Sequence, residues 1–148
     1  MRWSGVTTEL NKLVPKKVNI LSWRAELGKI PTRSVLRIKN INIGSLTCKL
    51  CDKAEETIDH LFTACQMSTY YLWSKIESWC KLPPLFAFSF RDLMVFHNSL
   101  VATKLRKELV LSVLQMTVWC IWKARNDAMF RQHRIIKEKM VDDVKMLS

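Results

Sequence analysis

The chain has 148 residues, of which 49% are hydrophobic and 25% are charged. This length fits one ordinary domain, and this balance excludes a chain that is disordered throughout. Twenty-four Lys and Arg against thirteen Asp and Glu give a formal net charge of +11, which favours polyanionic partners such as nucleic acid or an anionic membrane surface. Three Gly and four Pro are few for a chain of many hairpins, so we expect an all-α protein.

Nothing in the sequence indicates export or a membrane span. Polar and charged residues interrupt the first twenty positions, unlike the apolar core of a signal peptide. The longest apolar stretch, 109–122, falls short of the roughly 20 residues that a bilayer span needs and is interrupted by polar side chains. We therefore expect an intracellular, reducing compartment, nuclear or cytoplasmic, where the five cysteines bind metal or are buried instead of forming disulfides.

Two helices and a loop are predicted in the first third of the chain. Pro15 suits a first helical turn, and Gly28 followed by Pro31 ends that helix. Thr32 is the expected N-cap of a second helix over 32–40, and 40–46 is the expected connecting loop. In the second helix we expect Val35, Leu36 and Ile38 to face inward and Arg33, Arg37 and Lys39 to face solvent.

The remaining helices follow from apolar spacing and caps. Apolar residues recur every three or four positions from Thr57 to the Pro83–Pro84 break, which predicts one or two consecutive helices. Ser89 with Asp92 predicts a short helix covering 93–98, and the longest helix is expected over 105–130. The charged remainder to Ser148 is expected to fray or continue as a solvated helix. We divide the chain into a domain at 1–82 and a helical extension at 83–148 that packs on it.

A cluster of cysteines and one histidine, Cys48-x2-Cys51-x8-His60-x4-Cys65, is the sharpest signal in the chain. Three thiolates and one imidazole complete a tetrahedral Zn²⁺ shell and leave no position for water, which indicates one structural zinc ion and not a catalytic one. Plain burial of these residues, or a redox CxxC pair, explains the clustering less well. The other two cysteines, Cys80 and Cys120, lie on apolar helical faces and are expected in the core, and His97 and His133 are read as ordinary histidines.

Several motifs in order resemble one known family, the zinc-binding domain that follows the polymerase domain in reverse transcriptases of plant-type non-LTR (LINE-like) retrotransposons. The resemblance covers 14–73 well and 119–130 in part. Two departures are Lys49, where many members have Pro, and the absence of a preceding polymerase domain. The matching segments are Val14-Pro15-Lys16-Lys17-Val18, Leu21-Ser22-Trp23-Arg24-Ala25, Ile30-Pro31-Thr32, the two cysteines Cys48 and Cys51, Glu56-Thr57-Ile58-Asp59-His60-Leu61-Phe62 with Cys65, Trp73, and Cys120-Ile121-Trp122-Lys123-Ala124-Arg125-Asn126 with Phe130.

The resemblance implies a non-catalytic zinc module that helps an RNA-directed DNA polymerase to handle its RNA or DNA template. No acidic pair suited to two Mg²⁺ ions is recognisable, because Asp142-Asp143 lies in the charged tail and is expected to face solvent. We expect no enzymatic activity from this chain, no small-molecule substrate and no membrane partner. The alternatives are a protein-interaction module that docks on a polymerase domain, or an inactive transposon-derived fragment. A thiol or metallo-enzyme would need an open metal site or a recognisable Cys/His pair.

The positive charge is unevenly distributed, and this places the expected nucleic-acid contact. The net charge is +7 over 1–47 (nine basic, two acidic), −1 over 48–75 (three and four) and +5 over 76–148 (twelve and seven). The metal loop is therefore mildly acidic, and phosphate contact is expected on the flanking helices. The predicted contact residues are Lys16, Lys17, Arg24, Lys29, Arg33, Arg37 and Lys39, with Arg125, Arg131 and Arg134 as a second group.

Overall fold

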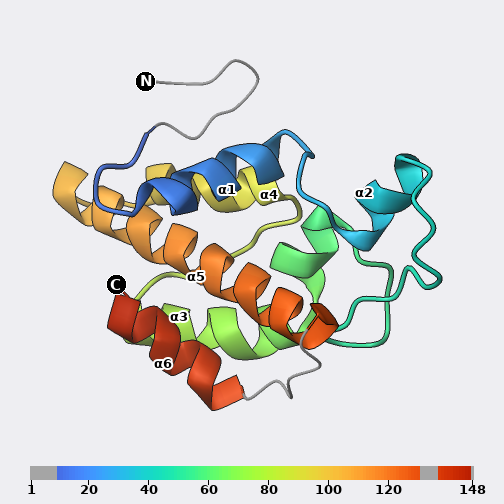
Figure 1. Ribbon diagram of the computed structural model, residues 1–148. Coiled ribbons are helices and arrows are strands. Elements are labelled where there is room, and N and C mark those ends of the chain that lie inside the picture. Colours follow the sequence, from blue (N-terminus) through green and yellow to red (C-terminus); the bar gives the residue numbers. More distant parts are fainter. Residues whose placement is uncertain (1–9, 131–136, 148) are drawn as a thin grey trace.

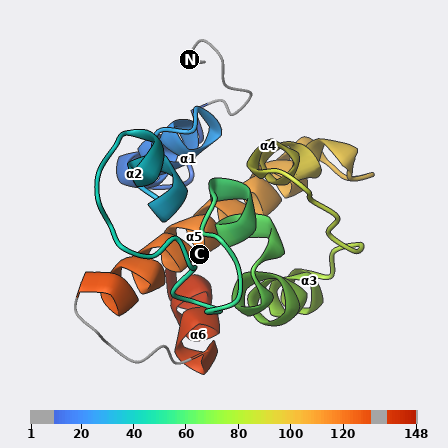
Figure 2. The ribbon, with the colours of Figure 1, turned by 90° about the vertical axis from the view of Figure 1, so that its right-hand side faces the viewer.

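The protein is helical, as predicted, and is built around one long central helix. The structure, a computed structural model, describes residues 10–130 and 137–147. Helix α5 (Lys104–Phe130) has 27 residues and runs through the middle of the molecule. Helices α1 (Lys16–Glu26) and α4 (Phe90–Val95) lie on one side of it, and α3 (Ser74–Cys80) and α6 (Lys137–Leu147) lie on the other (Figures 1 and 2).

Helix α2 (Arg33–Ile38) and the segment that follows its loop lie at one end of this arrangement (Figure 1). The long loop after α2 leads to two short π-helices, η1 (His60–Ala64) and η2 (Met67–Trp73), and η2 continues into α3. A 3-10 turn, η3 (Phe96–Ser99), extends α4. In the described residues, extended pairing is limited to a single bridge between Thr47 and Glu55.

The helix ends follow the local chemistry that the sequence indicated. Gly28 adopts φ +71° after α1, a left-handed conformation that glycine enters without steric cost. The Thr32 hydroxyl accepts a hydrogen bond from the backbone N–H of Val35 and caps α2. Ser89 and Asp92 form a complete capping box at the start of α4. The predicted boundaries of these helices are therefore confirmed to within a few residues.

The main hydrophobic core draws on both predicted segments. Leu61 and Phe62 from the first segment pack in one buried cluster with Leu114 and Ile121 of α5 and with Val144 of α6. Helix α5 contacts both α1 and η1. The division into two domains at residue 82 stays a prediction.

Two local predictions are wrong. In α2, Ile38 is 80% exposed whereas Arg33 is buried, because this six-residue helix lies at the edge of the fold and turns Arg33 toward the carbonyl of Ser45. The C-terminal tail does not simply fray or remain solvated: α6 packs against α5 and η2 and buries Val141 and Val144 in the core.

Candidate zinc site

The first two cysteines sit on a tight hairpin turn between Leu46 and Glu56. The backbone N–H of Glu56 donates to the carbonyl of Leu46, and that of Cys48 donates to Ala54. The turn closes with a hydrogen bond from the Asp52 N–H to the Cys48 carbonyl, and Asp52 takes a positive φ of 56°, which aspartate tolerates better than most residues. Cys48 and Cys51 thus lie on one short turn.

The other two ligands lie at the two ends of η1. The Thr57 hydroxyl accepts a hydrogen bond from the backbone N–H of His60, the first residue of this segment, at 2.9 Å. The Cys65 N–H then donates to the His60 carbonyl at 2.7 Å, a π-type bond over five residues. In an ordinary α-helix residues five apart point about 140° away from each other. The wider turn brings Cys65 round to the face of His60. The sequence predicted a regular helix here and not this π turn.

The four donor atoms lie close enough together to bind one tetrahedral zinc ion. A Zn–S bond of about 2.3 Å and a Zn–N bond of about 2.0–2.1 Å set the ligand atoms roughly 3.5–3.8 Å apart. The Sγ atoms of Cys48 and Cys65 are 4.0 Å apart, and the Cys51 Sγ lies 3.4 Å from the His60 Nε2. All four donor atoms lie within 4.8 Å of one another. The cluster fits one structural zinc ion.

Burial and hydrogen bonding set the protonation of the ligands in the metal-free chain. Hydrogen bonding to Cys65 and burial raise the pKa of the Cys48 thiol well above its ordinary value, although the backbone N–H groups of Cys51 and Leu50 oppose this shift. Burial lowers the pKa of His60, with a smaller opposing effect of the Glu56 carboxylate. The imidazole is therefore held in the neutral form that binds zinc, whereas Cys48 must lose a proton.

Two side-chain contacts support the turn and the helix that hold the metal ligands. The Trp73 indole N–H donates to the Phe62 carbonyl at 2.8 Å inside the core, which satisfies a carbonyl in the irregular π segment. Lys53 on the hairpin donates to the side chain of Gln66, just beyond Cys65, at 3.1 Å. The tryptophan identified from the family resemblance therefore has a definite structural partner.

A buried ion pair joins the metal hairpin to α5. Glu56, at the end of the hairpin, has a side chain that is 0% exposed and accepts hydrogen bonds from Arg125, whose side chain is 1% exposed, at 2.7–3.1 Å. Glu56 also accepts the backbone N–H of Arg33 at 2.9 Å, and Arg125 donates to the carbonyl of Pro31 at 3.1 Å. The Asn126 side chain accepts another guanidinium hydrogen bond. Three parts of the chain, 31–33, 56 and 125–126, thus meet at this pair.

Sequence reasoning missed this partnership, although a signal was present. Arg125 follows Leu114, Val118 and Ile121 at spacings of four, three and four, and all four residues are buried. An arginine in register with an apolar helical stripe indicates a buried guanidinium that needs an acidic partner. The glutamate in the segment that precedes His60 was the available candidate.

The predicted phosphate contacts fall into three groups in the structure. Arg125 and Arg33 are buried, and both guanidinium groups bond to the protein, so they do not present their charge at the surface. Arg131 and Arg134 lie outside the described residues. The remaining predicted cations are exposed, and these are Lys16, Lys17, Arg24, Lys29, Arg37 and Lys39.

The other cysteines and the other described histidine, His97, do not join the metal cluster. Cys120 is buried and Cys80 is half-buried, and both pack in the main core, as predicted. Burial raises the pKa of Cys120 to about 11. His97 is half-buried, and His133 lies outside the described residues.

The fold and the site define a helical protein with a Cys3His zinc site. The family described as zinc-binding in reverse transcriptase matches residues 5–73, a segment that contains all four ligands and both helices that precede them. This segment is a reverse transcriptase zinc-binding domain, and the match identifies no polymerase catalytic domain. No curated protein and no solved structure matches the chain. Of the helices described, none has the length and apolar character needed to cross a membrane.

Proposed function

We propose that this chain is a non-catalytic, zinc-stabilised module that binds RNA or DNA and contributes to template handling by a reverse transcriptase. Origin in a plant-type non-LTR element and an intracellular location are part of this proposal and are supported by the sequence alone. The zinc ion has a structural role in the module, because protein side chains take all four ligand positions and leave none for water. Binding would come from the helices that flank the metal hairpin.

One observation carries the binding proposal: the described residues 10–39 expose seven cations and no carboxylate. The single acidic residue of this segment, Glu26, has a side chain that is 1% exposed and is paired with Arg91 at 3.3 Å. A surface with one sign of charge attracts phosphate groups and releases their counterions. The basic face consists of Lys12, Lys16, Lys17, Arg24, Lys29, Arg37 and Lys39.

The test is the salt dependence of binding to a fluorescent oligonucleotide, for two variants of equal charge. The first replaces Lys16, Arg24 and Lys29 of the basic face by Ala, and the control replaces Lys75, Lys104 and Lys145, which are also exposed. Each phosphate contact contributes about −0.9 to the slope of log K against log salt for duplex and about −0.7 for single strands. We expect the first variant to lose affinity and up to about three units of slope. Equal losses in both variants, or binding insensitive to salt, would contradict the proposal.

A second candidate, a module that docks on a polymerase domain, is favoured by exposed apolar side chains. Phe86 is 77% exposed and Phe88 is 86% exposed, and at the start of α5 Leu105 is 62% exposed. Exposed apolar groups of this size are typical of interaction surfaces when they lie together. This candidate predicts binding of a hydrophobic dye and self-association at high concentration, both reduced by Leu105→Glu. A strict monomer without dye binding would remove it.

A further inference from the structure

The C-terminal half of α5 presents a face with three aromatic rings. Trp119, Trp122 and Phe130 recur at spacings of three and eight, and Lys123 and Asn126 lie between them in the sequence. At 100° per residue all five fall within a sector of about 100°. Phe130 is 73% exposed, and both tryptophans are half-buried. Trp119 and Trp122 also pack against the hydrophobic clusters, so each presents part of its ring at the surface, and Phe130 is the most exposed ring of the sector.

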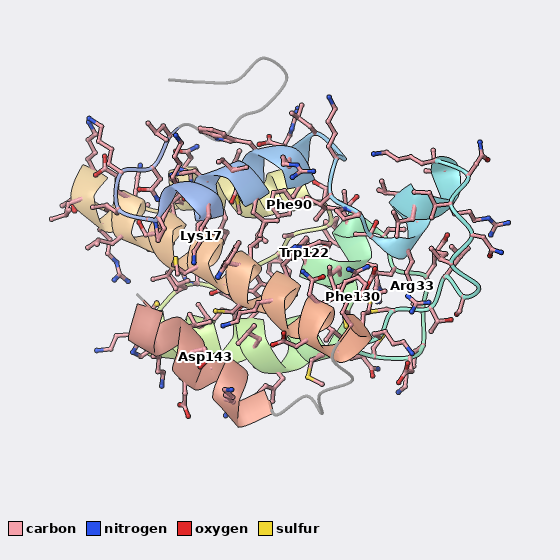
Figure 3. All side chains as sticks on the ribbon, in the orientation of Figure 1. Lys17, Arg33, Phe90, Trp122, Phe130 and Asp143 are labelled. Atoms are coloured by element: carbon pink, nitrogen blue, oxygen red, sulfur yellow. The ribbon has the colours of Figure 1, made fainter. Side chains whose placement is uncertain are left out.

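Cations accompany the two tryptophan rings. The Lys17 ammonium of α1 lies 4.9 Å from the centre of the Trp119 ring. The Arg125 guanidinium lies 4.7 Å from the centre of the Trp122 ring, but it is buried and paired with Glu56, so it packs on this ring without adding to the surface charge. Figure 3 shows Lys17 on α1, Trp122 near the middle of α5 and Phe130 at its end. Lys123, between the two tryptophans and Phe130, is exposed.

We infer that this sector of α5 is a stacking platform for the bases of a single-stranded nucleic acid, and this inference rests on the proposed function. Base stacking on aromatic side chains beside a positive groove is the usual way in which proteins hold single strands without sequence preference. Paired bases in a duplex do not offer their faces to a protein side chain. The platform is defined by Trp119, Trp122 and Phe130.

The size and the surrounding charge fit a short strand. From Trp119 to Phe130 the helix rises about 16 Å, a length that suits a strand of a few nucleotides. On the side of α1, Lys17 belongs to the basic face. On the other side, α6 carries Asp142 and Asp143 together with the exposed Lys139 and Lys145 and so has mixed charge, and Asp127 of α5 is half-buried. The phosphates are therefore placed toward α1, and the bases on the rings of α5.

The experiment compares two exposed phenylalanines. Phe130→Ala removes the most exposed ring of the platform, and Phe88→Ala removes a ring of similar exposure, 86%, from the segment between α3 and α4. Both variants are measured with a twelve-nucleotide oligo-U, an oligo-dT of the same length and a duplex, after circular dichroism shows an unchanged fold. The salt slope is recorded for each ligand.

We expect Phe130→Ala to weaken binding to both single strands about fivefold or more without changing the salt slope, because stacking releases no counterions. Duplex affinity and the Phe88→Ala variant should stay within twofold of the parent chain. Photocrosslinking of a thiouridine-substituted oligo-U to the unmodified protein should map to the α5 segment that contains Trp119 and Trp122.

The failures of this inference and of the proposed function are distinguishable. Salt-dependent binding that is unchanged in Phe130→Ala, or reduced equally in Phe88→Ala, would overturn the platform and leave the basic face in place. Crosslinks confined to α1 and α2 would do the same. A chain that binds neither single strands nor duplex would remove both.

Discussion

Arg125 and Glu56 are 69 positions apart in the sequence and form a buried pair in which the guanidinium Nε lies 3.1 and 3.0 Å from the two carboxylate oxygens. Glu56 belongs to the hairpin that carries Cys48 and Cys51, whereas Arg125 belongs to α5, outside the matched family segment. The pair therefore connects the metal hairpin to the central helix of the fold.

Breaking this pair should destabilise the protein strongly. Glu56→Gln or Arg125→Met leaves an uncompensated buried group, and we expect a loss of about 3–5 kcal/mol in the free energy of unfolding by urea. The double variant should cost less than the sum of the two. Lys123→Ala, an exposed cation two residues away, is the matched control and should change stability by less than about 0.5 kcal/mol. Additive losses would show that the two side chains act independently.

Acidification should release the metal. Protons compete with zinc for the thiolates, and the raised pKa of Cys48 in the metal-free chain strengthens that competition. His60 opposes release, because burial lowers its pKa and keeps the imidazole neutral. Apparent zinc affinity, followed with a chromophoric chelator, should therefore rise steadily with pH across the neutral range, and binding should release protons in calorimetry. Affinity independent of pH would contradict thiolate ligation.

Alkaline conditions should weaken the core through Cys120. Its folded pKa of about 11 lies above the ordinary value of 9.0, so the neutral thiol contributes stability that is present below pH 9 and is lost as the pH rises toward 11. Cys120→Ala cannot ionise, and the stability difference between parent and variant should shrink between these two pH values. The measurement is urea unfolding at several pH values. A constant difference would mean that Cys120 does not titrate differently on folding.

Removing the Trp73 donor should loosen the helix beside the metal ligands. Trp73→Phe leaves the Phe62 carbonyl without its buried partner, at a cost of about 1–3 kcal/mol in the free energy of unfolding. Trp79→Phe is the control, since Trp79 is 41% exposed and its loss should be small. If both variants unfold at the same denaturant concentration, the indole hydrogen bond contributes nothing.

Local sequence chemistry predicted most of the fold. Gly28, Thr32 and the Ser89–Asp92 box each act within a few residues of the backbone that they terminate or cap, so short-range rules were enough. The four zinc ligands could also be predicted from the sequence, because metal chemistry restricts both the residue types and their spacing.

Contacts between residues that are far apart in the sequence could not be predicted. Arg33 and Arg125 were predicted to be surface cations, since an arginine on a helix usually faces water. Their burial depends on the Ser45 carbonyl in one case and on Glu56 in the other, partners that only the folded chain brings near. The π turn between His60 and Cys65 likewise accompanies a contact from outside the turn, the hydrogen bond from the Trp73 indole to the Phe62 carbonyl.

The central claim is that Cys48, Cys51, His60 and Cys65 hold one structural zinc ion. Metal content per chain in the purified protein, measured before and after chelator together with helicity, tests it most directly. We expect one zinc per chain, held with an apparent binding free energy of about 10–16 kcal/mol as in other structural sites, and a loss of order when it is removed. A zinc content near zero, with helicity unchanged by chelator, would contradict it.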